Sequence, residues 1–503
     1  GMVNRDVSGL GVDHLNDLDL NDVKQIEIVK GPSSLLYANG SIGGIINVVD
    51  DCIAEMDFAG SEFSAGYEKQ SVNDGTAQNF NFKDNLGGFN VNIGYSKIEL
   101  GNFDVPDGAI LHEEEEHEGE EDHDEEEHEE HEPTSFMSAS TEYGAIFDLS
   151  NDNMTQKVVF NVLDEDSSII GEEAFMNPAT SEEFTLGYFM SKDIGMYNVD
   201  FGFRMDQIER SGSVTDEDHG DIDYYNIDDT TNSFAVALGR SLSDNLDVNL
   251  GFASVERLPS VIELFMNGPH LATGRLEVGN PNLKSETSNN FDVTFDYDNG
   301  DFFAYASFYI NEVDNYITLI DEDEDHDEDH GDEDHDEDHG DDDHGDDHGN
   351  LIHSFYVQEN AEFIGYELEF GRTVNLASGD LTYSFGRDQV NAEFADGHNV
   401  PRINPARNVY SLSYEQNDTV FKINLKSVER QNDFGEGETA TDSYRMLDTR
   451  VTKTFSVNDK SNMKVTLFAN NLLDSVARNH SSFVKGPVPL PGRNVGVKFN
   501  LTF

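Results

Sequence analysis

Histidine and acidic side chains are concentrated in two stretches of this 503-residue chain. Residues 112–132 read HEEEEHEGEEDHDEEEHEEHE, and residues 321–348 read DEDEDHDEDHGDEDHDEDHGDDDHGDDH. Eleven of the 17 histidines of the chain lie there: His112, His117, His123, His128, His131, His326, His330, His335, His339, His344 and His348. Proteins bind zinc and related divalent metals with imidazole nitrogen and carboxylate oxygen. The two tracts therefore predict an interaction with a divalent cation.

The spacing of the tract histidines does not predict a fixed metal geometry. Steps of four and five residues could stack imidazoles on a helix, but dense like charge on neighbouring turns and the poor helix propensity of Asp predict disorder. A charge run usually means only a solvated loop. The regular histidines favour a second interpretation, in which flexible loops capture cations weakly at each site and strongly through many sites. Calcium would use the carboxylates and would not need the imidazoles.

Charge and composition exclude several classes of function. The formal net charge is −72, and outside the two tracts 68 acidic residues still face 30 basic ones. Such a field repels nucleic acid and attracts cations, so we predict no nucleic-acid partner. The single cysteine excludes a disulfide framework and a thiolate metal cluster. The chain contains no apolar stretch long enough for a transmembrane helix and no secretory signal at its start, so a role in a membrane would require a β-barrel.

From about residue 60 onward, apolar and polar residues alternate in segments of eight to twelve residues separated by Asn, Asp and Gly turns. This pattern predicts antiparallel strands, with clear hairpins at 291–310 and 410–425 and a last strand at 494–503. A soluble sandwich or propeller would also alternate. Tight turns and long polar loops alternate along the chain, however, and both tracts fall on the long-loop side, as in outer-membrane barrels. We predict an all-β fold, a transmembrane antiparallel β-barrel of about eighteen strands, whose wide lumen must be plugged or conduct water.

Residues 22–51, DVKQIEIVKGPSSLLYANGSIGGIINVVDD, do not alternate in this way. They predict a strand at 26–29, a Gly-Pro turn, a helix-like stretch through Leu36 and a strand at 45–49. The order closely resembles the end of the plug domain of TonB-dependent outer-membrane receptors. Residues 256–290 and 467–503 resemble the segment before a mid-barrel strand and the C-terminus of the same receptors. GPHLATG, RNHSSF and the acidic histidine-rich loops are similar to the zinc-uptake (ZnuD-type) subgroup.

The resemblance implies two domains. Residues 1–56 would be the C-terminal part of a plug, and residues 57–503 a barrel of 18–22 strands with extracellular loops at 112–132 and 321–348. The family's plug exceeds a hundred residues and its barrel has 22 strands, so we expect the front of the plug, with the signal peptide and the TonB box, to be missing. The strand shortfall leads us to look for a lost hairpin pair just after the first tract.

The resemblance also implies partners and a location. These are the TonB-ExbB-ExbD energy-coupling complex, outer-membrane lipid and lipopolysaccharide, and the barrel assembly machinery, which would read the C-terminal Phe503. We expect a monomer in the bacterial outer membrane.

Ordered metal ligands are expected where the plug meets the barrel mouth. Asp13 and His14 resemble the Asp-His pair of a plug loop in zinc-uptake receptors, although a surface loop histidine is equally compatible with the sequence. His270 lies on a long loop, where it could instead pack a turn. Glu263 and His480 are weaker candidates because no spacing brings them to the same point.

We therefore predict active, TonB-dependent import of a divalent metal, with zinc as the first candidate, as a transported ligand and with no covalent cofactor. The alternative within the same class is a receptor for a metal chelate, siderophore or haem, with the acidic loops as accessories. A passive pore or a cation-buffering surface protein would not need the GPSSLLY plug motif. No nucleophile with a base partner, phosphate loop or metalloprotease helix is present, so we predict no enzyme.

Overall fold

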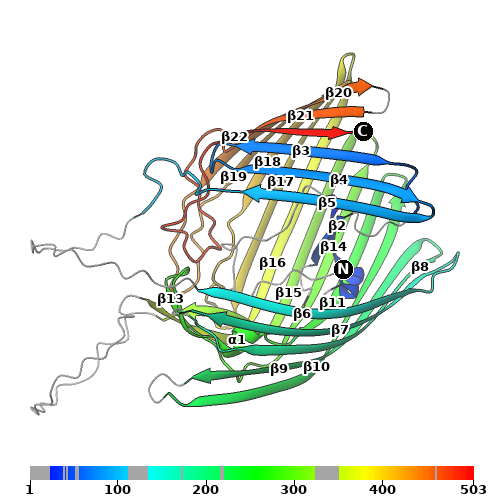
Figure 1. Cartoon of the computed structure of the whole chain (residues 1–503). Helices are drawn as coiled ribbons and strands as arrows, with labels where there is room; N and C mark the ends of the chain where they lie inside the picture. The colour runs from blue at the N-terminus through cyan, green and yellow to red at the C-terminus, as the bar shows by residue number, and fades with distance from the viewer. Residues whose placement is uncertain are drawn as a thin grey trace, which may run out of the picture.

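The fold was derived from a computed structural model of the chain, drawn in Figure 1. The structure describes residues 23–37, 40, 44–50, 56–111, 134–171, 174–215, 220–322, 351–458 and 461–503. Long antiparallel strands form a barrel, and a short N-terminal segment lies inside it (Figure 1).

Eighteen strands of the described residues form the barrel wall. They are β3 (Glu62–Gln70), β4 (Thr76–Leu86), β5 (Phe89–Glu99), β6 (Ser135–Asp148), β7 (Thr155–Ile170), β8 (Ala179–Ile194), β9 (Tyr197–Thr215), β10 (Ile222–Ser243), β11 (Leu246–Arg257), β14 (Glu286–Asp298), β15 (Phe302–Asp321), β16 (Ile352–Leu376), β17 (Gly379–Phe394), β18 (Arg407–Gln416), β19 (Thr419–Val428), β20 (Tyr444–Asn458), β21 (Ser461–Asn470) and β22 (Asn494–Thr502). The last strand, β22, pairs antiparallel with β3, which joins the two ends of the sheet. The predicted all-β barrel is confirmed.

The hairpins expected from the alternation are present. The segments 291–310 and 410–425 lie in the antiparallel pairs β14–β15 and β18–β19, and the segment 494–503 contains β22. Asn417 and Asp418 join β18 to β19, and Asn417 has φ = 49°, a left-handed conformation that asparagine tolerates better than most residues. Local turn chemistry and period-two patterning therefore agree along this part of the chain.

Among the described residues, β5 and β6 differ from the other neighbouring wall strands. All other neighbouring wall pairs are joined by an antiparallel ladder, whereas none joins β5 to β6, although both strands are described throughout. Figure 1 draws the two strands apart on the near side of the barrel. The connection between them carries the first tract, where the sequence predicted a lost hairpin pair.

The lumen and the outer surface are lined by alternate residues of each strand. Glu367 of β16 accepts a hydrogen bond of 3.0 Å from Lys30 of the inner segment, so it faces the lumen. Phe370, three residues further, faces outward and forms a row with Phe385 and Tyr410, with ring centroids 5.3 and 5.1 Å apart. An apolar, aromatic outer face and a polar lumen are the arrangement that a lipid bilayer requires of a barrel.

The inner segment contains β1 (Val23–Val29), the 3-10 helix η2 (Gly31–Leu36) and β2 (Ile45–Asp50). The two strands pair antiparallel, with Ile26 opposite Val48. Pro32 starts the helix, where its missing N–H costs nothing. This order is the one predicted from the Gly-Pro turn and the two apolar runs, while the domain boundary at residue 56 stays a prediction.

The long connections all lie at one end of the barrel, because each alternates with a tight turn at the other end. In sequence the two tracts fall between β5 and β6 and between β15 and β16, but apart from Asp321 and Glu322 they lie outside the described residues. The connection between β11 and β14 contains α1 (Val261–Phe265), β12 (Asn267–His270) and β13 (Arg275–Val278). We call this end of the barrel the mouth.

No helix in the described part of the chain is long and apolar enough to span a membrane.

Candidate functional site

The loop between β11 and β14 is folded by strong local signals. Ser260 caps α1 in a capping box: its hydroxyl accepts from the Glu263 N–H at 3.3 Å, and the Glu263 carboxylate accepts from the Ser260 N–H at 2.7 Å. After Met266 the chain turns into the β12–β13 hairpin, in which His270 lies opposite Arg275. Strand β13 also pairs in parallel with the first residues of β16, which fixes the hairpin against the barrel wall.

His270 is buried in this hairpin, at 3 % exposure. Its Nδ1 lies 3.0 Å from Oε1 of Glu277, and Thr273 donates to the same oxygen at 2.8 Å. The Phe175 ring stacks on the imidazole with centroids 4.5 Å apart. A carboxylate on one ring nitrogen fixes the orientation of a histidine and raises its basicity, as is common for histidines that bind metal through the other nitrogen.

His480 forms a second histidine–carboxylate pair, between two other loops of the mouth. It is 1 % exposed and lies in the connection between β21 and β22. Its Nδ1 is 3.0 Å from the Thr441 hydroxyl, and its Nε2 is 3.7 Å from Oε2 of Glu438. The second distance is too long for a hydrogen bond, so Nε2 faces the carboxylate without bonding to it.

Glu438 is held as a carboxylate by its surroundings. Its Oε2 accepts from the backbone N–H of Arg402 at 2.9 Å and of Gly435 at 3.1 Å, and Lys485 donates to Oε1 at 3.2 Å. Burial favours the neutral acid, but His480, these N–H groups and Lys485 outweigh it and lower the pKa of Glu438 to about 2. The group is therefore negatively charged at any physiological pH.

A continuous chain of contacts connects the two pairs. Arg275, between His270 and Glu277 in the hairpin, binds Asp321 through two nitrogens at 2.8 and 2.6 Å. Its guanidinium lies 4.8 Å from the centre of the Phe483 ring, and that of Arg402 lies 4.4 Å from the same ring. Because the Arg402 N–H donates to Glu438, the contacts run from one histidine pair to the other across the mouth.

Glu263, a predicted metal ligand, is engaged in the scaffold. Arg257 donates to both of its oxygens, at 2.8 and 3.1 Å, and also binds Glu286 at 3.1 Å. The carboxylate also accepts the capping hydrogen bond from Ser260. Metal binding by Glu263 stays a prediction from the sequence, and in the structure its contacts orient α1.

The other predicted ligands lie outside the described residues. They are Asp13, His14, His112, His117, His123, His128, His131, His326, His330, His335, His339, His344 and His348. Of the predicted set, the structure thus places His270 and His480 at one mouth with Glu263 nearby. Within the described ranges, no group of three or more His, Cys, Asp and Glu side chains forms a metal-holding cluster. The ordered ligands there come as pairs.

Sequence reasoning missed the two carboxylate partners. Glu277 could have been found, because a hairpin through the Thr-Gly turn of HLATGRLE brings it close to His270. Glu438 could not, because 42 residues and two wall strands separate it from His480. Phe483 ends the RNHSSF motif, but nothing in the sequence predicted that Arg275 and Arg402 stack on its ring.

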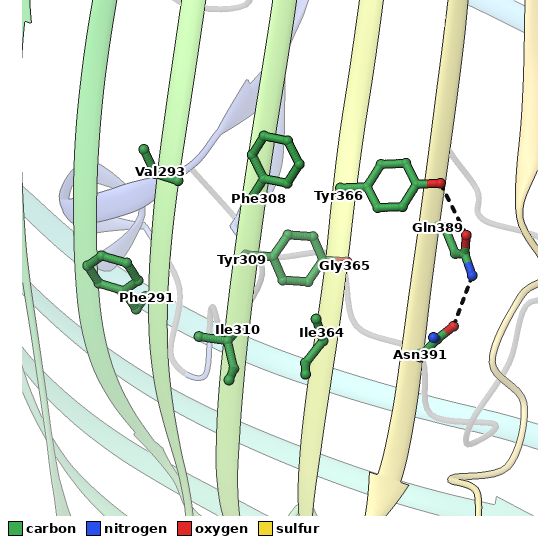
Figure 2. Close-up of a pocket in the computed structure, with 10 residues that line it drawn as sticks. All are labelled: Phe291, Val293, Phe308, Tyr309, Ile310, Ile364, Gly365, Tyr366, Gln389 and Asn391. Carbon is green, nitrogen blue, oxygen red and sulfur yellow. Dashed lines mark hydrogen bonds between the residues drawn. The ribbon is translucent and has the colours of Figure 1, made fainter.

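A separate surface pocket of about 440 Å³ lies on the wall of β14 to β17, away from the mouth pairs. Figure 2 shows its apolar part, with Phe291, Phe308 and Ile364, and its polar edge at Gln389 and Asn391. Tyr366 donates to Gln389 at 3.1 Å, and Gln389 donates to Asn391 at 3.2 Å. Its lining has no carboxylate and no imidazole, so it offers no site for a divalent metal.

Known protein families match both parts of the chain. The TonB dependent receptor-like β-barrel matches residues 37–472, and the TonB-dependent Receptor Plug Domain matches residues 2–45. The first match spans most of the chain. The protein therefore belongs to the TonB-dependent receptors, outer-membrane transporters whose import is coupled to TonB.

Solved structures share this fold at low sequence identity. The copper transporter OprC matches with a TM-score of 0.69 and 14% identity, over 95% of this chain and 86% of that one. The FrpB iron transporter from Neisseria meningitidis (F5-1 variant) matches with a TM-score of 0.65 and 12% identity, over 97% and 90%. The unliganded ferric citrate transporter FecA matches with a TM-score of 0.61 and 12% identity, over 97% and 85%. At these identities the likeness establishes the fold alone.

Proposed function

We propose that this receptor imports a divalent metal ion, zinc in the first place, across the bacterial outer membrane. The observation that carries the proposal is the presence of two buried histidine–carboxylate pairs, His270–Glu277 and His480–Glu438, at the same mouth. A buried polar group must be compensated, and a cation compensates an imidazole nitrogen and a carboxylate together.

The distance within the second pair supports a metal ion. Zinc binds imidazole nitrogen and carboxylate oxygen at about 2.0–2.2 Å, so one ion can bridge two atoms that lie between about 3.3 and 3.8 Å apart. His480 Nε2 and Glu438 Oε2 are 3.7 Å apart. In the first pair Glu277 would orient the histidine without binding the metal itself. It contacts Nδ1 of His270, so the other ring nitrogen points away from it.

In this proposal the two tracts capture cations, and Asp13 and His14 of the plug contribute to their selection. The loops at 112–132 and 321–348 gather cations through their charge and their many weak sites, which raises the local metal concentration at the mouth. Selection follows at ordered ligands, the two mouth pairs with Asp13 and His14. TonB-driven rearrangement of the plug then releases the ion inward. Zinc, nickel, copper and cobalt all accept these ligands, so zinc rests on the similarity to the zinc-uptake subgroup.

Elemental analysis of the full-length protein tests this proposal. We expect deletion of residues 321–348 to lower the total metal bound while tight, stoichiometric zinc remains. We expect the double variant His270→Ala, His480→Ala to lose the tight zinc. The matched control is His398→Ala, because that histidine is 73 % exposed and pairs with Asp396 in its own loop. Loss of tight zinc on tract deletion, with retention in the double variant, would overturn the assignment.

One observation favours a second function, import of a metal carried by an anionic chelator. Arg275 and Arg402 both stack on Phe483, and among the described residues no carboxylate lies within ion-pair distance of the Arg402 guanidinium. Burial lowers the pKa of Arg402, because it disfavours the charged form of the guanidinium. If this function holds, Arg402→Met abolishes binding of zinc citrate; if the bare ion is the cargo, the variant binds free zinc as the parent does.

A further inference from the structure

The inner segment is attached to the barrel very unevenly. Helix η2 contacts β8, β9, β10 and β11, and Leu35 and Leu36 are only 2% and 7% exposed. The β1–β2 hairpin, in contrast, leaves Ile28 and Ile46 each 72% exposed. Among the described residues outside η2, the half-exposed pair of Lys30 and Glu367 connects the inner segment to the wall. Burial thus concentrates the binding energy of this segment at η2.

A glycine makes the close approach of η2 to the wall possible. A Cβ atom on Gly202 of β9 would come within 2.4 Å of the carbonyl oxygen of Pro32 and within 3.1 Å of the carbonyl carbon of Pro32. Both atoms are backbone, so neither can move aside without moving the helix. Gly187 of β8 leaves ordinary space for Leu36, 3.7 Å from its ideal Cβ position. The helix therefore rests directly on the backbone of β9.

A buried arginine fixes the helix to the same place. Arg204, two residues beyond Gly202, donates from Nη1 to the Leu35 carbonyl at 3.3 Å. Its Nε binds Asp206 at 2.8 Å and its Nη2 binds the Thr185 hydroxyl at 3.1 Å. Arg204 and Asp206 are 5% and 1% exposed. The planar fork of arginine suits three directed bonds at once, which the ammonium of lysine on its flexible stem does not reproduce.

We propose that Arg204 and Gly202 are positioning residues for transport, which hold η2 on β9 while the β1–β2 hairpin is the part that moves. The plug segment is then released on the side of β16, where, within the part of the chain that the structure describes, the half-exposed Lys30–Glu367 pair connects it to the wall. Exposed ion pairs of this kind contribute little to stability, whereas the buried contacts at η2 resist displacement of the helix from the wall. These roles of Arg204 and Gly202 do not depend on which cargo the receptor imports.

The test is the conductance of the full-length receptor in a planar bilayer as urea releases the plug. We expect Arg204→Lys, which keeps a charge for Asp206 but not the fork, to raise the equilibrium constant for release about tenfold, as for loss of one charge-assisted hydrogen bond. Gly202→Ala should raise it at least as much. Lys30→Met should change it less than threefold.

Gly386→Ala on β17 is the matched control, because its Cβ would meet its nearest neighbour at 3.6 Å. Migration of unheated protein in detergent gels verifies that each barrel is folded. If Arg204→Lys fails to fold, Gly202→Ala alone carries the comparison with Lys30→Met. A Lys30→Met effect equal to or larger than that of Gly202→Ala, or no effect of Gly202→Ala, would overturn the proposal.

Discussion

The two histidine–carboxylate pairs at the mouth use the same groups in opposite arrangements. In the hairpin, Glu277 contacts Nδ1 of His270 at 3.0 Å, so the acid orients the ring. Between the loops, Thr441 takes Nδ1 of His480, and Glu438 faces Nε2 at 3.7 Å, so the acid lies where a metal would bind. Under the proposed function, Glu277 would orient a metal-binding histidine, whereas Glu438 would itself be a metal ligand.

The largest effect is expected from Glu438→Gln. The amide keeps the shape but removes a charged oxygen ligand, and we expect zinc affinity to fall more than 100-fold. Competition titration of the purified protein with a zinc chelator measures this. An affinity within threefold of the parent would show that Glu438 only braces its loop against Lys485 and Arg402.

Glu277→Gln should cost less, about 10- to 100-fold, which is the usual price of removing a carboxylate that orients a metal-binding histidine. The same titration measures it. A larger loss for Glu277→Gln than for Glu438→Gln would reverse the roles assigned to the two acids.

These two acids also mark the limit of what could be predicted from sequence. The barrel and its hairpins follow from period-two alternation and turn residues, and the inner strand–helix–strand order follows from two apolar runs and a Gly-Pro turn; all of these are local signals. His270 was a candidate ligand because it lies on a long loop, and His480 was a weaker one; both lie in motifs similar to the zinc-uptake subgroup. Glu438 was not found as a candidate. It lies in the loop before β20, whereas His480 lies in the loop after β21, and the contact between these loops depends on barrel closure, which no local pattern encodes.

Lowering the pH should weaken binding at both pairs, and by the same cause. Protons compete with metal for imidazole nitrogen, so zinc affinity should fall between pH 8 and pH 5.5. The lowered pKa of Glu438, about 2, means that this acid stays ionised throughout the range. Zinc titration at the two pH values, in buffers that bind no metal, measures the change. Unchanged affinity would contradict a histidine site.

Glu438 should also make the stability of the mouth loops sensitive to low pH. Its pKa is lowered on folding, so its stabilising contribution is complete above the unfolded value of about 4.3 and is lost as the pH falls through about 2. We expect hydrogen exchange of residues 429–443 to be unchanged between pH 7 and pH 5, after correction for intrinsic rates. Lys485→Met should shift the onset of opening to higher pH, because it removes a partner that lowers this pKa.

The smallest effect is expected from Thr441→Val, which removes the hydroxyl at Nδ1 of His480. A neutral hydrogen bond contributes about 1 kcal/mol, so zinc affinity should fall about fivefold. The loss should be absent in a protein that already carries His480→Ala. Additive losses in the double variant would mean that Thr441 acts on the loop and not through the imidazole.

The most direct test of the mouth assignment is zinc X-ray absorption on the zinc-loaded protein with residues 112–132 and 321–348 deleted. With the tracts gone, the two pairs should still supply a first shell that contains imidazole nitrogen together with carboxylate oxygen. The imidazole signal should diminish in the His270→Ala, His480→Ala variant. A shell of oxygen alone, or an imidazole signal that the double substitution leaves unchanged, would contradict the account.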